Sequence, residues 1–168
     1  NDTATTSWSA GNDAGNLAVG GAGGRLLLTS PGSRTIYTDT GASQALEAFE
    51  VDNFEPADFG AASDAALWAL FGSSTEAGYE QQVAWTRGYD AYDQDGDSIT
   101  DEPRRWILGD ILHSQPLVVN YGALGGFDED NPDLRLLVGT NAGFVHMFGA
   151  SDGDEDWAFT PKALVDLH

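Results

Sequence analysis

The stretch LRLLVGTNAGFVHMFGASDGDEDWAFTP, residues 134–161, determines the fold class that we expect for this chain. It contains three short apolar runs, LRLLVG, GFVHMFG and DWAFTP, which are separated by TNAG and ASDGDE. Short apolar runs divided by Gly, Asn and Asp are typical of strands joined by tight turns. The stretch therefore predicts an antiparallel β-meander, and its recurring aromatic residues are typical of a β-propeller blade.

A single blade cannot bury both of its faces, so propellers contain several copies of the unit. We find no second copy in the 168 residues, and the region 103–168 is long enough for one blade of ~40–50 residues. We therefore expect a mainly β protein whose blade is incomplete as a closed propeller. The chain is then part of a larger architecture.

The region 34–89 precedes this blade and predicts strands followed by a short helical insertion. RTIYTDTG and ALEAFEV show imperfect apolar alternation, and TDTGAS supplies a turn between them. SDAALWALFG (63–72) predicts a helix with Ser63 as its N-cap and Gly72 at its end. STEAGYEQQVAWTRG (74–88) predicts a second helix that directs Tyr79, Val83 and Trp85 inward.

The region 1–33 is a lead-in segment rich in Gly and Ser. Only LAV (17–19) and RLLLT (25–29) in it indicate short strands. GGAGGR lacks the Lys-Ser/Thr of a phosphate-binding loop, so we assign its glycines to turns or close backbone packing. Further along the chain, PLVVNYG (116–122) predicts another strand.

The composition restricts the partners of the chain. Its 27 acidic and 7 basic residues give a formal net charge of −20, which disfavours nucleic acid and anionic membranes and favours a cation. The absence of cysteine excludes disulfides and thiolate metal sites. No apolar run approaches the ~20 residues of a membrane-spanning helix.

The region 90–102 is an acidic loop that contains YDQDGDSITDE. Counted from the first Asp of DQDGDSITD, acidic residues occupy positions 1, 3, 5 and 9, and Ile99 occupies position 7. Calcium takes 6–8 oxygen ligands, and alternate spacing in a tight loop directs every second oxygen to one centre. We therefore predict a Ca²⁺ site formed by Asp93, Asp95, Asp97, the backbone carbonyl of Ile99, and Asp101. The side chain of Ile99 is expected to point into the core.

The loop differs from an EF-hand at two positions. Ser98 replaces the glycine of position 6, and Arg104 replaces the bidentate Glu of position 12. Glu102 or Asp90 are candidates for the missing ligand, and a site without it suits the higher calcium concentration outside cells. The alternative is a solvated acidic turn, because DQDG favours a turn without any ion.

The sequence contains no catalytic constellation that we can identify. His113 and His146 lack a partner at zinc-ligand spacing, and we expect both to be packed or hydrogen-bonded strand residues. Ser114 adjoins His113, but adjacent residues do not form a nucleophile and its base. We therefore expect no enzymatic activity.

Two long motifs carry a family resemblance. RRWILGDILHSQPLVVNYG (104–122) and LLVGTNAGFVHMFGASDGDEDWAFTP (136–161) resemble the start of the C-terminal β-propeller of the PilC/PilY-type, type IV pilus tip-associated proteins. GGA at 20–22, RTIYT at 34–38 and WTRG at 85–88 are similar to upstream pieces of that family. The family's better-known calcium loop lies within the propeller, so the ligands predicted here depend on spacing alone.

The resemblance implies a secreted protein of the pilus tip that acts in pilus assembly and as an adhesin. Its implied location is extracellular, on the cell surface or fimbrium, with an association with the outer membrane as a further possibility. Its implied partners are pilins or minor pilins, host or surface ligands, and the remainder of its own propeller.

Two other functions stay open at this point. One is a fragment of a quinoprotein-like propeller dehydrogenase, whose cofactor requires calcium. The other is a structural subunit of another calcium-stabilised extracellular filament.

Overall fold

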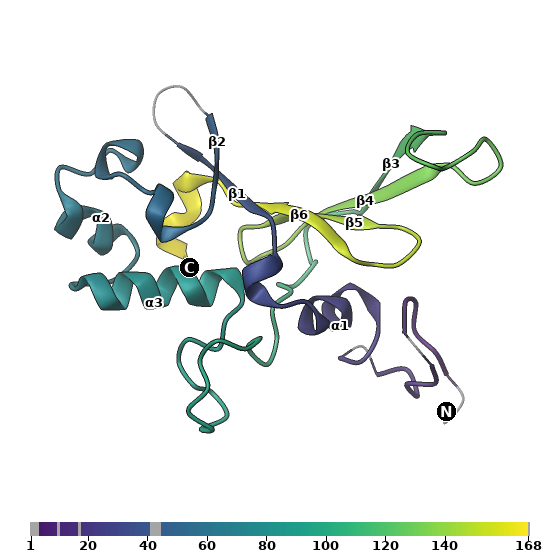
Figure 1. The fold of residues 1–168 in the computed structure, drawn as a ribbon, viewed down its shortest axis with the longest axis horizontal. Helices are drawn as coiled ribbons and strands as arrows, with labels where there is room; N and C mark the ends of the chain where they lie inside the picture. Colours follow the sequence, from purple (N-terminus) through teal and green to yellow (C-terminus); the bar gives the residue numbers. More distant parts are fainter. Residues whose placement is uncertain (1–3, 10, 17, 41–44, 168) are drawn as a thin grey trace.

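The computed structural model describes residues 4–9, 11–16, 18–40 and 45–167. Six strands form one sheet in the order β2-β1-β6-β5-β4-β3 (Figure 1). Their bounds are β1 Ile36–Thr40, β2 Ala45–Ala48, β3 Leu117–Gly122, β4 Asp133–Gly139, β5 Val145–Gly149 and β6 Glu155–Phe159.

The predicted meander is confirmed. Strands β3 to β6 pair antiparallel with their neighbours along the chain, and they include all three apolar runs. β1 adds to the outer strand β6 in parallel, which makes the sheet mixed. The protein is therefore mainly β, and its sheet is not closed, which is consistent with an incomplete propeller.

The helical insertion between the strands is also confirmed. Three α-helices and four 3₁₀-helices are described: α1 Gly21–Leu28, α2 Asp64–Leu70, α3 Glu76–Arg87, η1 Pro31–Ser33, η2 Val51–Asn53, η3 Pro56–Phe59 and η4 Lys162–Leu167. The Ser63 hydroxyl accepts a hydrogen bond from the backbone N–H of Ala66, and Thr75 caps α3 in the same way. Gly72 adopts φ 74° directly after α2, as its predicted role as a helix end requires.

The predicted strand RLLLT is wrong, because residues 25–28 lie in α1 and Thr29 is its C-cap. The glycines of this segment permit close packing: a Cβ on Gly23 would lie 2.3 Å from the Trp106 ring, and one on Gly24 would lie 2.7 Å from the backbone of Val19. Leu26 packs beside Ile107 and beside Val138 and Phe148 of the sheet. Tertiary burial of one helix face therefore overrides the weak helix propensity of glycine.

The predicted strand LAV is also not formed, because residues 18 and 19 lie in a turn. Residue 17 lies outside the described residues, and so does part of the turn predicted at TDTGAS, residues 41–43.

The core lies between one face of the sheet and the helices. Its centre is a group of aromatic rings from the insertion, in which Phe49 and Phe54 have ring centroids 5.1 Å apart and Phe71 and Tyr79 have centroids 5.0 Å apart. Ile36 and Ala158, on β1 and β6, pack against this group. Figure 1 shows α2 and α3 beside the β1–β2 end of the sheet, with β3 and β4 at the other end.

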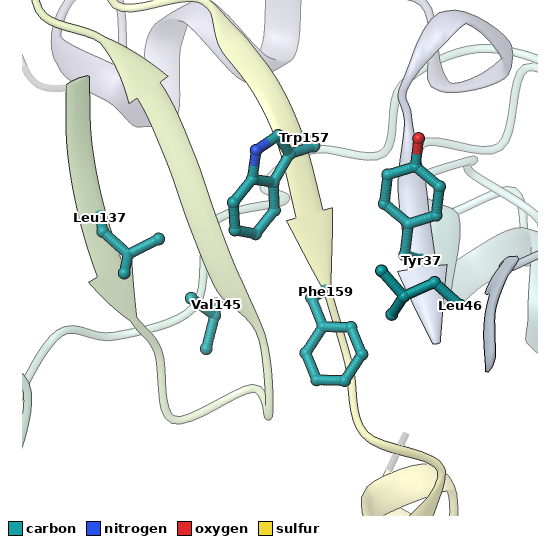
Figure 2. A pocket seen from close by; sticks show the side chains of 6 residues that line it. All are labelled: Tyr37, Leu46, Leu137, Val145, Trp157 and Phe159. Atoms are coloured by element: carbon teal, nitrogen blue, oxygen red, sulfur yellow. The ribbon is translucent and has the colours of Figure 1, made fainter. Parts of the chain in front are cut away.

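On the other face of the sheet, apolar side chains from five strands line a groove (Figure 2). An antiparallel sheet with one solvated face normally alternates apolar and polar residues. None of the described helices has the length and hydropathy of a membrane span.

Candidate metal centre

The acidic loop is closed at its base by a short stem at the end of α3. Tyr89 pairs with Pro103 in an antiparallel bridge. The backbone N–H of Asp90 donates to the carbonyl of Glu102 at 2.8 Å. The stem fixes the distance between the ends of the loop, so the carboxylates in between cannot separate freely.

Side chains of α3 also hold the first residues of the loop. The Gln81 amide donates to the backbone carbonyl of Ala91 at 2.6 Å, and the Tyr92 hydroxyl donates to the Gln82 side chain at 2.7 Å. Figure 1 shows the loop extending below α3, away from the sheet. The loop is thus attached to a helix that is itself packed in the core.

An aromatic residue of α3 stabilises the other side of the stem. The Arg104 guanidinium lies 4.5 Å from the centroid of the Trp85 ring, and the rings of Trp85 and Tyr92 meet edge to face at 5.2 Å. The predicted inward direction is confirmed for Tyr79 and Val83, which are buried, whereas Trp85 is half-buried beneath Arg104.

Carboxylate oxygens shape the loop itself. The backbone N–H groups of Ser98 and Ile99 donate to the carboxylates of Asp93 and Asp97 at 3.1 and 2.8 Å. Asp93 and Ser98 both adopt the left-handed conformation, at φ 51° and 69°. These turns wind the chain tightly, as the spacing of the acidic residues requires.

Two groups of three carboxylates form in this loop. Asp93, Asp95 and Asp97 each offer one oxygen, and these oxygens lie within 4.8 Å of one another. Asp90, Asp95 and Glu102 form a second group by the same measure. Asp95 belongs to both groups. Asp90 and Glu102, the candidates for the missing bidentate ligand, therefore lie next to a predicted ligand.

The remaining two predicted ligands are placed differently. Asp101 is in neither group among the described residues. The Ile99 side chain is 46% exposed, so its expected core position is wrong. The reason is that the loop extends away from the sheet and offers this side chain no apolar surroundings. The role of the Ile99 carbonyl stays a prediction.

The electrostatics of the second group show repulsion that a cation would relieve. Burial raises the pKa of Glu102, and the charges of Asp97, Asp95, Asp90 and Asp101 raise it further. Asp90 is 1% exposed, and both of its carboxylate oxygens accept the backbone N–H of Gln94, at 3.0 and 2.9 Å.

The donor set fits a hard cation. All the grouped side chains offer carboxylate oxygens, which suit calcium and magnesium and do not select zinc or copper. Calcium accepts 6–8 such ligands in irregular geometry, whereas magnesium retains several waters and binds one or two carboxylates. The five carboxylates gathered here therefore match calcium better.

A second charged cluster lies in the core, at a place where the sequence analysis predicts no site. Arg34 donates to both carboxylate oxygens of Glu155, from Nε at 2.7 Å and from Nη2 at 3.0 Å. His146 Nδ1 lies 2.7 Å from the same carboxylate. A carboxylate only accepts, so His146 carries its proton on Nδ1. We call Arg34, His146 and Glu155 the buried triad.

The buried triad joins the insertion to the sheet. Arg34 Nη1 donates to the backbone carbonyl of Arg87 at 2.5 Å, and Arg87 donates in turn to the carbonyl of Phe49 at 2.8 Å. Burial raises the pKa of Glu155, but the hydrogen bonds from His146 and Arg34 outweigh this effect and hold the pKa at about 2. The three residues come from RTIYT, GFVHMFG and DGDEDW, all of which carry the family resemblance.

The expectations for histidine are confirmed only in part. His146 is buried in β5, stacked against Phe148. His113 is exposed and lies outside the strands, so its expected packed position is wrong. Ser114 accepts a hydrogen bond from the backbone N–H of Gly139 at 3.0 Å.

The comparisons with known proteins give one distant relative. The chain is 28% identical over 166 residues to the type IV pilus biogenesis factor PilY1 of Pseudomonas aeruginosa (strain UCBPP-PA14). The match covers 86% of this chain and 13% of the relative, so the chain corresponds to a small part of that protein's length. No family model matches the chain, and no solved structure matches it. The similarity indicates a region distantly related to that pilus biogenesis factor.

Proposed function

We propose that the chain is a calcium-binding part of a type IV pilus tip-associated adhesin or pilus assembly factor. The observation that carries this proposal is the convergence of the Asp93, Asp95 and Asp97 carboxylates within 4.8 Å, on a loop whose base is closed against α3. The similarity to a pilus biogenesis factor supports the pilus context. The role is one of binding and assembly, without enzymatic activity.

The proposed ligand set extends the sequence-based prediction. It consists of carboxylate oxygens and one backbone carbonyl, from Asp93, Asp95, Asp97, Ile99 and Asp101. Asp90 and Glu102 are further donors, because their oxygens lie within 4.8 Å of that of Asp95. Calcium supplies positive charge that offsets the repulsion among these groups.

The consequence for the protein follows from the stem. With the carboxylates held together, Tyr89 and Pro103 stay paired, and the backbone N–H of Arg104 keeps its 2.9 Å hydrogen bond to the carbonyl of Gly88. These contacts set the direction in which the chain leaves α3 toward β3. The loop thus acts as a clamp between the insertion and the sheet.

The sheet is proposed to be one blade of a propeller. β3 to β6 form a four-stranded antiparallel unit, which is the size of a propeller blade. The remainder of the propeller would cover its open face. At the pilus tip, on the cell surface, the other proposed partners are pilins or minor pilins and host or surface ligands.

Thermal unfolding with calcium and with a chelator tests the clamp. A ligand that binds only the folded state at 100 times its Kd adds about 2.7 kcal/mol, which raises Tm by roughly 5–10 °C in a chain of this size. Asp95→Asn should remove most of this shift because Asp95 belongs to both carboxylate groups. The matched control is Asp130→Asn, an exposed Asp in another acidic turn. An unchanged Tm in protein verified to be metal-free after chelation would refute the clamp.

A further inference from the structure

A groove, which we call the α3 groove, runs along one face of α3 beside the candidate metal centre. Its larger part is a cavity of about 610 Å³ between the helix and the acidic loop below it (Figure 1). Its smaller part is a cavity of about 270 Å³ between the helix and the segment that contains η2. The two cavities adjoin, because Glu80, Ala84 and Tyr89 line both of them.

The sequence of α3 explains the shape of this groove. Ala77, Glu80, Ala84 and Arg87 follow one another at intervals of three or four residues, so they lie on one face of the helix. The two alanines leave space that longer side chains would fill. From Ala77 to Arg87 the helix rises by about 15 Å. An extended peptide of roughly four or five residues has the same length.

The acidic loop contributes the opposite wall of the larger cavity. Ala91 and Asp101 line the cavity on this side. The Gln81 amide, which donates to the carbonyl of Ala91 at 2.6 Å, holds the loop beside the helix. The lining of the larger cavity therefore combines alanines and the aromatic residue Tyr89 with two acidic residues, Glu80 and Asp101.

The negative charge of the larger cavity is not balanced from within. Among the described residues, no Lys, Arg or His lines it. Glu80 and Asp101 form no ion pair with any other residue that the structure describes. The charge of Glu80 is felt on the core side of the helix, where burial, and then this charge, raises the pKa of Tyr79 to about 12.

Nearby arginines are engaged elsewhere. Arg87 lines the smaller cavity, but its buried guanidinium donates to backbone carbonyls and lies 3.6 Å from a carboxylate oxygen of Glu50. Arg34 belongs to the buried triad, and Arg104 lies over the Trp85 ring. The smaller cavity thus contains its own positive charge, whereas the larger cavity lacks one among its described residues.

We propose that the α3 groove binds an extended, positively charged segment of another polypeptide, with a Lys or Arg side chain in the larger cavity. The aliphatic stem of that side chain would contact the alanines and the Tyr89 ring, and Glu80 and Asp101 would attract its charged end. A second copy of this chain fits poorly, because each copy carries a net charge of −20 and a single Lys. The proposal goes beyond the calcium clamp, because the Gln81 contact to Ala91 also holds the loop in place.

Two short peptides test this chemistry. One has Lys at its centre between alanines, and the other has acetyl-lysine there, which keeps the stem and removes the charge. The Lys peptide should bind roughly fivefold tighter, because two partly exposed ion pairs contribute modestly, and the difference should shrink at high salt. An NMR titration of the isotope-labelled chain, in the presence of calcium, measures such weak affinities. The chemical-shift changes should lie in α3 and the acidic loop.

Variants separate the groove from the net charge of the chain. Glu80→Gln should weaken binding of the Lys peptide roughly threefold. The matched control Glu76→Gln removes the same charge from an exposed position of α3 outside the groove lining, and should change binding by no more than about twofold. Ala77→Phe should block the larger cavity without changing the charge, whereas Ala69→Phe, at an exposed position of α2, should have no effect.

Several results would overturn the proposal: equal binding of the two peptides, equal effects of the two Glu variants, or unchanged binding in Ala77→Phe. Self-association of the chain that is lost in Glu80→Gln would also overturn it, in favour of a second copy. A calcium-dependent shift of Tm without peptide binding overturns the groove alone. Peptide binding without that shift refutes the clamp alone, so the two failures are distinguishable.

Discussion

Replacing Glu155 with Gln removes the charge at the centre of the buried triad while keeping the size of the side chain. The carboxylate is 1% exposed and accepts from both Arg34 and His146. Glutamine would leave the Arg34 guanidinium, also 1% exposed, without its counter-charge. Removing one partner of a buried ion pair costs ~3–5 kcal/mol, since the other charge remains buried.

The pKa of Glu155 gives an independent magnitude for the same contact. The pKa falls from an ordinary 4.5 to about 2, which corresponds to about 3 kcal/mol of stability in the charged form. Both routes therefore predict a loss of about 3 kcal/mol near neutral pH. For a domain of this size, that loss lowers Tm by roughly 6–12 °C.

The pH dependence has a defined sign. A carboxyl group with a depressed pKa in the folded state contributes its full stability above the unfolded pKa, here 4.5, and loses it as pH falls toward about 2. The difference in stability between wild type and Glu155→Gln should therefore be constant near neutral pH and shrink below pH 4.5. Comparing the two proteins cancels the contribution of Asp13, whose pKa is also lowered to about 2, mainly by the Thr6 hydroxyl.

Urea unfolding followed by circular dichroism measures the effect. The matched control is Arg25→Gln, which breaks the partly exposed pair with Asp154 and should cost at most about 1 kcal/mol. If Glu155→Gln is no more destabilising than this control, the buried triad does not stabilise the fold as argued.

Two further predictions concern single sites. Gly153→Ala should lower the free energy of unfolding in urea by roughly 1–3 kcal/mol, because Gly153 has φ 73° and a Cβ there would lie 2.4 Å from the Trp8 ring. A variant as stable as the wild type would contradict the packing of Trp8 against Gly153. Tyr79 should ionise after the more exposed tyrosines in an ultraviolet absorbance titration, since burial and then the charge of Glu80 raise its pKa to about 12. The stability that neutral Tyr79 contributes is full below pH 10 and falls as pH rises toward about 12. Tyr79→Phe should therefore remove this fall. If the absorbance titration of that variant is unchanged, the late-ionising tyrosine is not Tyr79.

Local signals allowed much of the sheet and the insertion to be predicted. The meander follows from apolar runs separated by turn residues, and each run became a strand. The two helices of the insertion begin at Ser63 and Thr75, whose side chains cap the first turn. Such signals depend on residues close in sequence, so they can be recognised without knowledge of the fold.

The error at α1 has the opposite cause. Its first turn is rich in glycine, which disfavours helices, and its leucines have no clear period. The helix forms where Gly23 can approach Trp106 and where Leu26 can pack with Val138, residues more than 80 positions away. No local pattern contains this information.

For the candidate metal centre, too, one part could be predicted from the sequence and another part required the tertiary structure. The alternate spacing of Asp93, Asp95 and Asp97 identified one carboxylate group, because a short loop brings its own residues together. Placing Asp90 and Glu102 beside Asp95 required the stem formed by Tyr89 and Pro103. The exposed position of Ile99 depended on where the loop extends relative to the core.

The sequence by itself determined the strands of the meander, the two capped helices and the register of acidic residues, all of which arise from contacts between near neighbours. Only the tertiary structure decided that Arg34 meets Glu155, 121 positions away, and that apolar side chains from five strands line one groove on the sheet. The physical reason is that packing between segments far apart in the sequence decides which side chains are buried and which buried charges meet. A sequence pattern shows which residue types are present, but not which of them come into contact in the fold.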